Sequence, residues 1–329
     1  MSEIRKDPLT GRGVIIAPER APRTKQLGAD VNINSVQVCP FCPGNENLTP
    51  PELWADRPGD SPPDQPGWSV RVVPNKYPAV SSGKAPERQT RDRAAAIGVH
   101  EVIIESATHV ANLAALDQSQ FARVVYAYRQ RLRAARENTC WRFRLLFKNH
   151  GERAGATFEH THAQLVALPF VPVDVEVELA SAGQYYQRNG HCYFCALLRR
   201  EMHARARMVI DNAEFIALCP SAPRFAFETW ILPRIHTPAF EDTDDVSLAA
   251  FAGIARKVIA ALDRLETNPP FNYFIQSLSL DEREREHSHW QFRLLPQFSR
   301  AAGFEWGSGL HINPVAPEDA ARILRDAAI

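Results

Sequence analysis

Cysteines and histidines recur in this chain in the same order, and this repeat constrains the fold more than any other feature. Each set holds a Cys-x-x-Cys pair, a single histidine and a His-x-His-x-Gln triplet. The sets are Cys39, Cys42, His109 and His160-Thr161-His162-Ala163-Gln164, then Cys192, Cys195, His236 and His287-Ser288-His289-Trp290-Gln291. In both sets, 51 residues separate the single histidine from the first histidine of the triplet. The ordered recurrence indicates an internal duplication. We therefore expect an α+β fold of two similar units, 1–170 and 171–329, joined into an antiparallel sheet system with helices packed against it.

Hydrophobic periodicity predicts similar elements in both halves. In the first half we expect strands at 68–73, 100–104 and 142–148 and an amphipathic helix at 118–137. In the second half we expect strands at 215–219, 227–232 and 271–276 and a helix at 246–266. The alternation of Phe143, Leu145 and Phe147 predicts a half-buried strand. Residues 49–68 are expected to form a loop, and residues 170–190 a connector.

The charge balance of the chain excludes some classes of partner. Lysine and arginine together number 38, as do aspartate and glutamate, so the formal net charge is zero. That balance argues against non-specific binding to nucleic acid or membrane through overall charge. The N-terminus lacks the apolar core of a signal peptide, and no apolar run could span a bilayer. We expect a cytoplasmic protein. Residues 1–35 are polar and predict a loosely packed arm, unless Arg20 or Arg23 reaches a phosphate.

The repeated cysteines and histidines are candidate metal ligands, because two thiolates with two imidazoles form a common closed set for zinc. The first candidate site is Cys39, Cys42, His109 and His160. The second is Cys192, Cys195, His236 and either His287 or His289, and the spacing favours His287. One alternative is that these thiols and histidines bind no metal. A redox dithiol is a less well supported alternative, because neither Cys-x-x-Cys pair begins a predicted helix that follows a strand. Cys140 and Cys219 are expected to be inert core thiols.

The first triplet also predicts chemistry. His160, His162 and Gln164 occupy alternate positions of an apolar run, so on a strand they would share one face. The glycine-containing turn at 151–157 precedes them, and its N–H groups could approach a phosphate closely. Imidazoles, an amide and such a turn indicate phosphoryl-group chemistry. The alternative is that these histidines are ordinary core or surface residues.

Motifs spread over nearly the whole chain carry a family resemblance. They are Cys39-Pro-Phe-Cys42, Asn75-Lys-Tyr-Pro78, Asn149-His-Gly151, Ala154-Gly-Ala-Thr157 before the His-x-His-x-Gln triplet, Phe227–Pro233, Ala302–Gly309 and Ile312–Val315. Together they resemble the galactose-1-phosphate uridylyltransferase family, the transferase branch of the histidine-triad superfamily. A third-position glutamine marks that branch. The second Cys-x-x-Cys and the run Phe227–Pro233 are most similar to its ADP-glucose phosphorylases. Thr161 and Ala163 replace the family's usual Pro and Gly, which argues against galactose specificity.

The resemblance implies two histidine-triad-like units and a role for each matching residue. His162 would attack the α-phosphorus of a nucleoside diphosphate sugar, and an acceptor would then cleave the nucleotidyl-histidine. Gln164 would bind the transferring phosphoryl oxygens. The residues that match the family's phosphate contacts are Gly155, Ala156 and Thr157. Those that match its nucleotide contacts are Asn75 and Asn149, and those that match its hexose contacts are Phe304 and Glu305. In the family the last two come from the partner subunit, which implies a homodimer. The family pattern also makes His160 a zinc ligand and selects His289 rather than His287 for a second zinc.

Three hypotheses follow for function. The first is a nucleotidyltransferase acting on an NDP-hexose and either a sugar 1-phosphate or phosphate, with uridylyl and adenylyl transfer in competition. The second is a zinc-stabilised nucleotide-binding protein without turnover, although the intact pair of His162 and Gln164 argues against it. The third is a dinucleoside polyphosphate phosphorylase or hydrolase of the same superfamily. No residue type in the sequence selects the base, the hexose or the acceptor.

Overall fold

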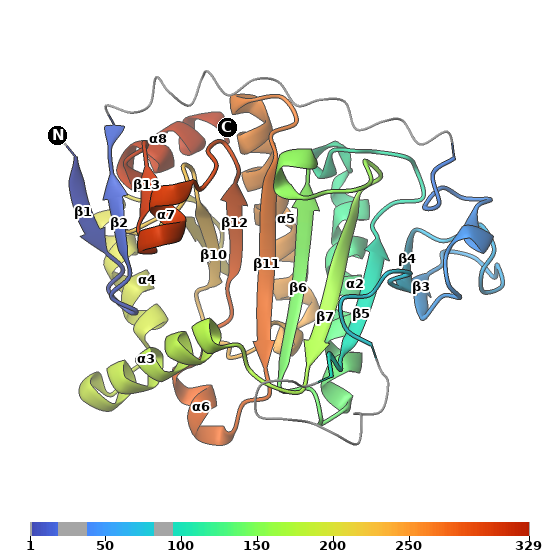
Figure 1. Ribbon diagram of the computed structural model, residues 1–329, viewed down its shortest axis with the longest axis horizontal. Helices are drawn as coiled ribbons and strands as arrows, with labels where there is room; N and C mark the ends of the chain where they lie inside the picture. Colours follow the sequence, from blue (N-terminus) through green and yellow to red (C-terminus); the bar gives the residue numbers. More distant parts are fainter. Residues whose placement is uncertain (1, 19–37, 82–94, 329) are drawn as a thin grey trace.

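The computed structural model describes residues 2–18, 38–81 and 95–328, and a ten-stranded antiparallel sheet runs through its centre (Figure 1). The order is β3-β4-β5-β7-β6-β11-β12-β10-β9-β8. The first half supplies β3 (Trp54–Asp56), β4 (Val70–Pro74), β5 (Val99–Ile104), β6 (Phe143–His150) and β7 (His162–Leu168). The second half supplies β8 (Met208–Asp211), β9 (Phe215–Leu218), β10 (Thr229–Pro233), β11 (Phe271–Leu278) and β12 (Phe292–Pro296). The α+β class and the antiparallel sheet are confirmed.

The strand order is mirrored about the boundary between β6 and β11. There Phe147 pairs with Phe274. The row of paired residues from β5 to β10 reads Val102, Gln164, Phe147, Phe274, Arg293 and Trp230. A local twofold axis between the two phenylalanines therefore relates Gln164 to Arg293. This is the arrangement that a duplicated sequence would produce. The division into two units at residue 170 stays a prediction, since both halves share one sheet and one hydrophobic core.

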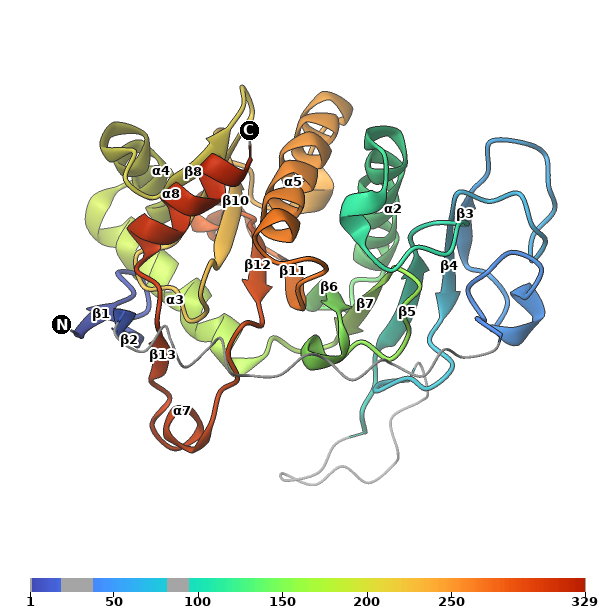
Figure 2. The ribbon, with the colours of Figure 1, turned by 90° about the horizontal axis from the view of Figure 1, so that it is seen from above.

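Two long amphipathic helices cover one face of the sheet (Figure 2). They are α2 (Gln118–Glu137) and α5 (Asp245–Leu265), and α8 (Pro317–Ala327) lies beside α5. Each long helix begins after an aspartate whose side chain accepts a main-chain N–H of the first turn, Asp117 and Asp244. Their apolar stripes and the sheet form the main core. The opposite sheet face is crossed near β12 by α3 (Val173–Asn189) (Figure 2).

Strand β6 buries the face opposite to the one that its apolar alternation predicts. Arg144, Leu146 and Lys148 are buried, whereas Leu145 and Phe147 are partly exposed. The charged side chains are tolerated because buried carboxylates pair with both of them. The prediction of the buried face was wrong because the helices, not the pattern of one strand, decide which face is covered.

The N-terminal residues are ordered into a small second sheet, contrary to the expected loose arm. Strand β1 (Glu3–Lys6) pairs with β2 (Gly13–Ile16), and β2 runs parallel to β13 (His311–Asn313). Val14 and Ile16 are each 1% exposed, so this segment has a packed face. Arg20 and Arg23 lie outside the described residues.

Other segments differ from their sequence-based expectation. The connector at 170–190 is mostly the 17-residue helix α3, and the loop at 49–68 contains β3. Cys140 is exposed, so it is not a core thiol, whereas Cys219 is buried. The remaining helices are α4 (Tyr193–Ala204), α6 (Glu282–His287), α7 (Gly303–Ser308) and the 3-10 turns η2 (Glu46–Leu48), η3 (Leu113–Ala115), η4 (Glu152–Ala154) and η5 (Phe240–Asp242). Among the described helices, none has the length and apolar character needed to cross a membrane.

Candidate active site and metal centres

His162 is the first residue of β7, and the main chain holds its ring in one tautomer. Its Nδ1–H donates to the carbonyl oxygen of His160 at 2.8 Å, which leaves Nε2 unprotonated in the neutral ring. Nε2 has no hydrogen-bond partner within the described part of the chain. Burial, followed by the nearby charge of Lys148, lowers the pKa of His162 to about 4. At neutral pH this ring therefore offers a free lone pair, which is what a nucleophile requires.

A buried ion pair lies behind His162. Lys148 Nζ donates to Glu105 Oε2 at 2.6 Å, to Thr161 Oγ1 at 2.9 Å and to the carbonyl oxygen of His162 at 2.8 Å. The Thr161 hydroxyl also donates to Glu105, at 2.5 Å. Burial by itself would raise the pKa of Glu105, but the charge of Lys148 and these hydrogen bonds hold it below its usual value. The ionised network therefore holds the side chain of Thr161 and the main-chain carbonyl of His162 in place.

His100 orients the amide of Gln164. The Ala79 N–H donates to Nδ1 of His100 at 3.0 Å, so the proton of the neutral ring lies on Nε2. That Nε2–H donates to Oε1 of Gln164 at 2.8 Å, and Asn75 Nδ2 approaches the same oxygen at 3.4 Å. The amide NH2 of Gln164 is therefore left to donate to a ligand. Gln164 lies two residues after His162 on β7, so both side chains are on one face.

A glycine-bracketed turn follows β6. Gly151 and Gly155 flank η4 with φ values of 78° and 88°, which residues with a side chain rarely adopt. Asn149 Nδ2 approaches the carbonyl oxygen of Gly155 at 3.4 Å, and Asn272 Nδ2 donates to Asn149 Oδ1 at 2.9 Å. Gly155 and Thr157 are exposed.

A cavity that is open to solvent lies between this turn and the triplet. Asn149, Ala156 and His162 are among its lining residues, together with Lys148 and His160. The structure thus brings together the predicted nucleophile and two of the predicted nucleotide or phosphate contacts. Gln164 lies next to this group on β7, and Asn75, directly after β4, approaches Gln164.

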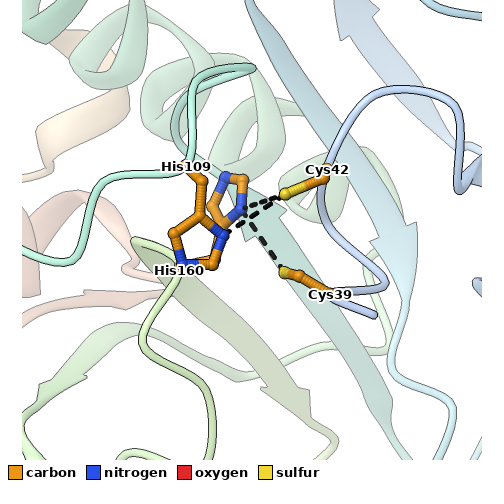
Figure 3. A group of neighbouring side chains, drawn as sticks. All are labelled: Cys39, Cys42, His109 and His160. Carbon is orange, nitrogen blue, oxygen red and sulfur yellow. Dashed lines mark hydrogen bonds between the residues drawn. The ribbon is translucent and has the colours of Figure 1, made fainter. Parts of the chain in front are cut away.

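The first Cys/His group is assembled from three separate segments (Figure 3). The ligand atoms of Cys39, Cys42, His109 and His160 all lie within 4.8 Å of one another. Cys42 Sγ is 3.3 Å from Nδ1 of His109 and 3.6 Å from Nδ1 of His160. Tetrahedral zinc with bonds of about 2.0–2.3 Å separates its ligand atoms by roughly 3.3–3.8 Å. The His160 Nε2–H donates to the Ser106 carbonyl at 2.8 Å, which leaves Nδ1 for a metal. The donor set and its spacing therefore fit such an ion.

The second group has the same geometry. The ligand atoms of Cys192, Cys195, His236 and His289 also lie within 4.8 Å of one another. Cys195 Sγ is 3.5 Å from Nδ1 of His236 and 3.7 Å from Nδ1 of His289. His289 donates from Nε2 to the Pro233 carbonyl at 3.0 Å. The structure does not place His287 in this group, because His287 ends α6 and packs beside the ring of Tyr186, 6.2 Å away.

The twofold relation explains why equal spacing pointed to His287. The axis relates Gln164 to Arg293, and each lies four residues after the histidine of its own metal group, His160 or His289. By the same relation Gln291 takes the place of His162. The two His-x-His-x-Gln triplets are therefore out of register by two residues, and the second half has no histidine at the position of His162.

Phe304 and Glu305 lie far from His162 within one chain. They belong to α7, next to β13, whereas β12, β11 and β6 separate β7 from α7 (Figure 1), and the view from above also shows α7 away from β7 (Figure 2). Glu305 accepts the Ala302 N–H at 2.9 Å, and the Phe304 side chain is 48% exposed. One chain alone therefore does not bring these two residues to the site.

Comparisons with known proteins show the family of this chain. The sequence profile of the galactose-1-phosphate uridyl transferase N-terminal domain matches residues 1–172. ADP-glucose phosphorylase from Arabidopsis thaliana is 33% identical over 99% of this chain and 93% of that protein. The chain belongs to the galactose-1-phosphate uridylyltransferase family. Galactose-1-phosphate uridylyltransferase from Thermotoga maritima, another member, is 27% identical over 100% of this chain and 99% of its own length.

Solved structures of family members share the whole fold. The Arabidopsis thaliana ADP-glucose phosphorylase with bound ADP-glucose superimposes with a TM-score of 0.82, at 32% identity and with 99% of each chain covered. A uridylyltransferase structure has a TM-score of 0.77 at 25% identity, covering 100% of this chain and 98% of that one. The likeness therefore extends over both halves of the sheet.

Sequence reasoning missed the residues that hold the triplet in place. His100 and Lys148 each interrupt an otherwise apolar strand pattern, which was the available signal. Glu105 directly follows the strand expected at 100–104 and belongs to no motif. Because their contacts join residues far apart in the chain, only the assembled sheet reveals them.

Proposed function

We propose that this protein is a nucleotidyltransferase that moves a nucleoside monophosphate from an NDP-hexose to phosphate or a sugar 1-phosphate through a nucleotidyl-His162 intermediate. The observation that carries this proposal is the unprotonated Nε2 of His162, which hydrogen-bonds to no described residue and lies beside a cavity lined in part by the glycine-bracketed turn. Family membership supports it, because the named relatives are nucleotidyl-transferring or phosphorolytic enzymes of sugar phosphates.

The chemistry balances without an external base. Nε2 of His162 attacks the α-phosphorus, the bond from that phosphorus to the bridging oxygen breaks, and sugar 1-phosphate leaves with the electron pair. The ring gains positive charge, which the Nδ1–H hydrogen bond to the His160 carbonyl stabilises. An oxyanion of the acceptor then attacks the same phosphorus, the P–N bond breaks, and the neutral imidazole returns.

Other residues bind and orient in this proposal. The NH2 of Gln164 donates to the non-bridging oxygens as charge develops on them, and it has no proton to lose. Gly155, Ala156 and Thr157 border the phosphates. The contact to them comes from Thr157, because the N–H groups of Gly155 and Ala156 already donate to the carbonyl oxygens of Glu152 and Gly151. Asn75 and Asn149 contact the nucleotide. Lys148 keeps β7 in place through the His162 carbonyl.

We propose zinc as the metal of both Cys/His groups, since two thiolates and two imidazoles are a preferred set for that ion. Zinc would act structurally, with all four positions taken by protein atoms. In the first group it would fix His160, whose carbonyl orients the nucleophile.

Adenylyl transfer from ADP-glucose to phosphate is the more strongly supported specificity. The Arabidopsis ADP-glucose phosphorylase is 33% identical to this chain, against 27% for the Thermotoga uridylyltransferase. Uridylyl transfer between UDP-glucose and a hexose 1-phosphate is the second candidate.

We also propose a cytoplasmic homodimer. Trp306 and Phe304 are two large apolar side chains of the same short helix, α7, and they are 80% and 48% exposed, which would suit insertion into a partner's site. Light scattering of the purified protein tests the dimer, and a monomer at micromolar concentration would contradict it.

Intact-protein mass spectrometry tests the intermediate. The protein is incubated briefly with ADP-glucose or UDP-glucose without acceptor and quenched in alkali, because a phosphoramidate is labile in acid. We expect an adenylyl adduct on the wild type that is lost in His162→Ala and kept in the control His203→Ala, an exposed residue of α4. A uridylyl adduct would select the second specificity. No adduct with either sugar nucleotide on metal-loaded protein would favour a nucleotide-binding protein without turnover.

A further inference from the structure

A second polar cavity, open to solvent, lies in the C-terminal half on the sheet face that carries Gln164 in the first half. It is bordered by β12, α3 and the turn between β1 and β2. Three arginines line it, Arg12, Arg224 and Arg293. They come from three separate segments of the chain, so the fold rather than a local motif gathers them.

Arg293 is the counterpart of Gln164 across the local twofold axis. It is 8% exposed, and its guanidinium stacks on Trp230 with its carbon 4.6 Å from the ring centre. Nε donates to Gln291 at 3.0 Å and Nη2 pairs with Glu178, while Nη1 has no partner in the described ranges. The position that carries a neutral amide in the first half thus carries a fixed cation here.

Arg224 is a half-buried cation whose side chain makes no hydrogen bond to any described residue. Burial lowers its pKa; the carboxylate of Glu228 opposes that effect, and the charges of Arg12 and Arg293 add to it. Glu178 also raises the pKa of Arg224. The positive charge of Arg224 also acts on His311, whose pKa is lowered first by burial and then by that charge. A partly buried guanidinium that shares a cavity with two other cations and bonds to no carboxylate is stabilised when an anion joins them.

The acidic residues of the cavity are already engaged. Asp7 accepts the N–H groups of Leu9 and Thr10, at 3.1 Å and 2.7 Å. Glu228 accepts the Arg224 N–H at 2.7 Å and, through its other oxygen, the Trp230 indole N–H at 2.9 Å. Glu178 is taken by Arg293. None of the three hydrogen-bonds to the side chain of Arg12 or Arg224.

We propose that Arg12, Arg224 and Arg293 form a second anion site that binds a phosphate group. Guanidinium groups from different directions suit the several oxygens of a phosphate better than a single carboxylate. The ligand is inorganic phosphate or the phosphate of a sugar 1-phosphate. The site binds without chemistry, because Gln291 stands where the first half has His162. The analogy with Gln164 rests on the function proposed above, but the cavity and its arginines do not.

Thermal unfolding with added phosphate tests this site, because a ligand that binds only the folded state raises the melting temperature. Inorganic phosphate and glucose 1-phosphate form two arms, each against sodium chloride of matched ionic strength. The proteins are the full-length wild type, Arg224→Gln, Arg224→Lys and Gln164→Ala. The concentration that gives half of the maximal shift measures the affinity.

We expect phosphate to stabilise the wild type, and we expect Gln164→Ala to keep the part of the shift that the three arginines contribute. Removing one guanidinium should weaken the effect about tenfold to a hundredfold in Arg224→Gln, with a smaller loss in Arg224→Lys. A response confined to glucose 1-phosphate would identify the sugar phosphate as the ligand. The proposal is overturned if neither anion stabilises the wild type, if Arg224→Gln responds like the wild type, or if Gln164→Ala alone loses the response. If Arg224→Gln does not fold, the same comparison is made with Arg12→Ala, whose side chain makes no hydrogen bond to a described residue.

Discussion

His100 and Gln164 are joined by a hydrogen bond of 2.8 Å that runs from the Nε2–H of the imidazole to Oε1 of the amide. Ala79 decides its direction, because its N–H occupies Nδ1 of the same ring. The amide NH2 is thereby turned away from the protein. An amide that could rotate freely would present its oxygen to a phosphate half of the time, and that contact is repulsive.

The first prediction concerns this pair. His100→Ala should lower kcat for nucleotidyl transfer about tenfold, the effect of one hydrogen bond to a developing charge. KM should change less, since the bond orients a group without binding substrate. Steady-state kinetics measures both constants. His100→Gln, which keeps a donor, should recover part of the loss, and an unchanged kcat in His100→Ala would contradict the orienting role.

The second prediction concerns the buried pair of Lys148 and Glu105. Lys148→Met should lower the free energy of unfolding by about 3–5 kcal/mol, because it leaves a carboxylate buried without its cation. Adding Glu105→Gln should return much of that stability, since the uncompensated charge is then gone. Urea unfolding of the single and double variants measures the difference. A double variant less stable than Lys148→Met would show that the charge itself is not the cause.

The third prediction separates the two histidines of the second triplet. His289→Ala should lose one metal ion per chain, because His289 belongs to the second Cys/His group. His287→Ala is the matched control and should keep its full metal content. Elemental analysis of the purified variants counts the ions. Metal loss in His287→Ala with retention in His289→Ala would reverse the assignment.

The fourth prediction is a pH dependence of stability. Burial lowers the pKa of His150 to about 4 from its ordinary 6.5, and its ring stacks on Phe271 with centres 4.6 Å apart. Between these values the unfolded chain binds more protons, so unfolding becomes easier as the pH falls. The loss from His150 is on the order of 3 kcal/mol between pH 6.5 and pH 4.

Urea unfolding at several pH values, for the wild type and His150→Phe, measures that share. The phenyl ring retains the stacking on Phe271 but has no titrating group, so its stability should fall less steeply below pH 6.5. Parallel curves for the two proteins would mean that other groups cause the whole dependence.

Several parts of the fold were readable from local sequence. The helix expected at 118–137 is α2 with the same ends, because its stripe of apolar residues and the capping Asp117 are local signals. The ordered Cys-x-x-Cys and histidine repeat predicted that cysteines and histidines would meet in two groups. The choice between His287 and His289 was not readable, since equal spacing hid a two-residue shift of register.

By itself, the sequence determined most of the helices and strands, because these depend on residues close to one another in the chain. It also determined the candidate metal ligands and the residue types of the site, because these are visible as motifs and as a repeat. Only the tertiary structure decided which face of β6 is buried, that Lys148 and His100 support His162 and Gln164, and that Arg12, Arg224 and Arg293 meet. The physical reason is that burial and electrostatic contact are properties of surfaces brought together by sheet register. Residues 281 positions apart, such as Arg12 and Arg293, carry no local signal of one another.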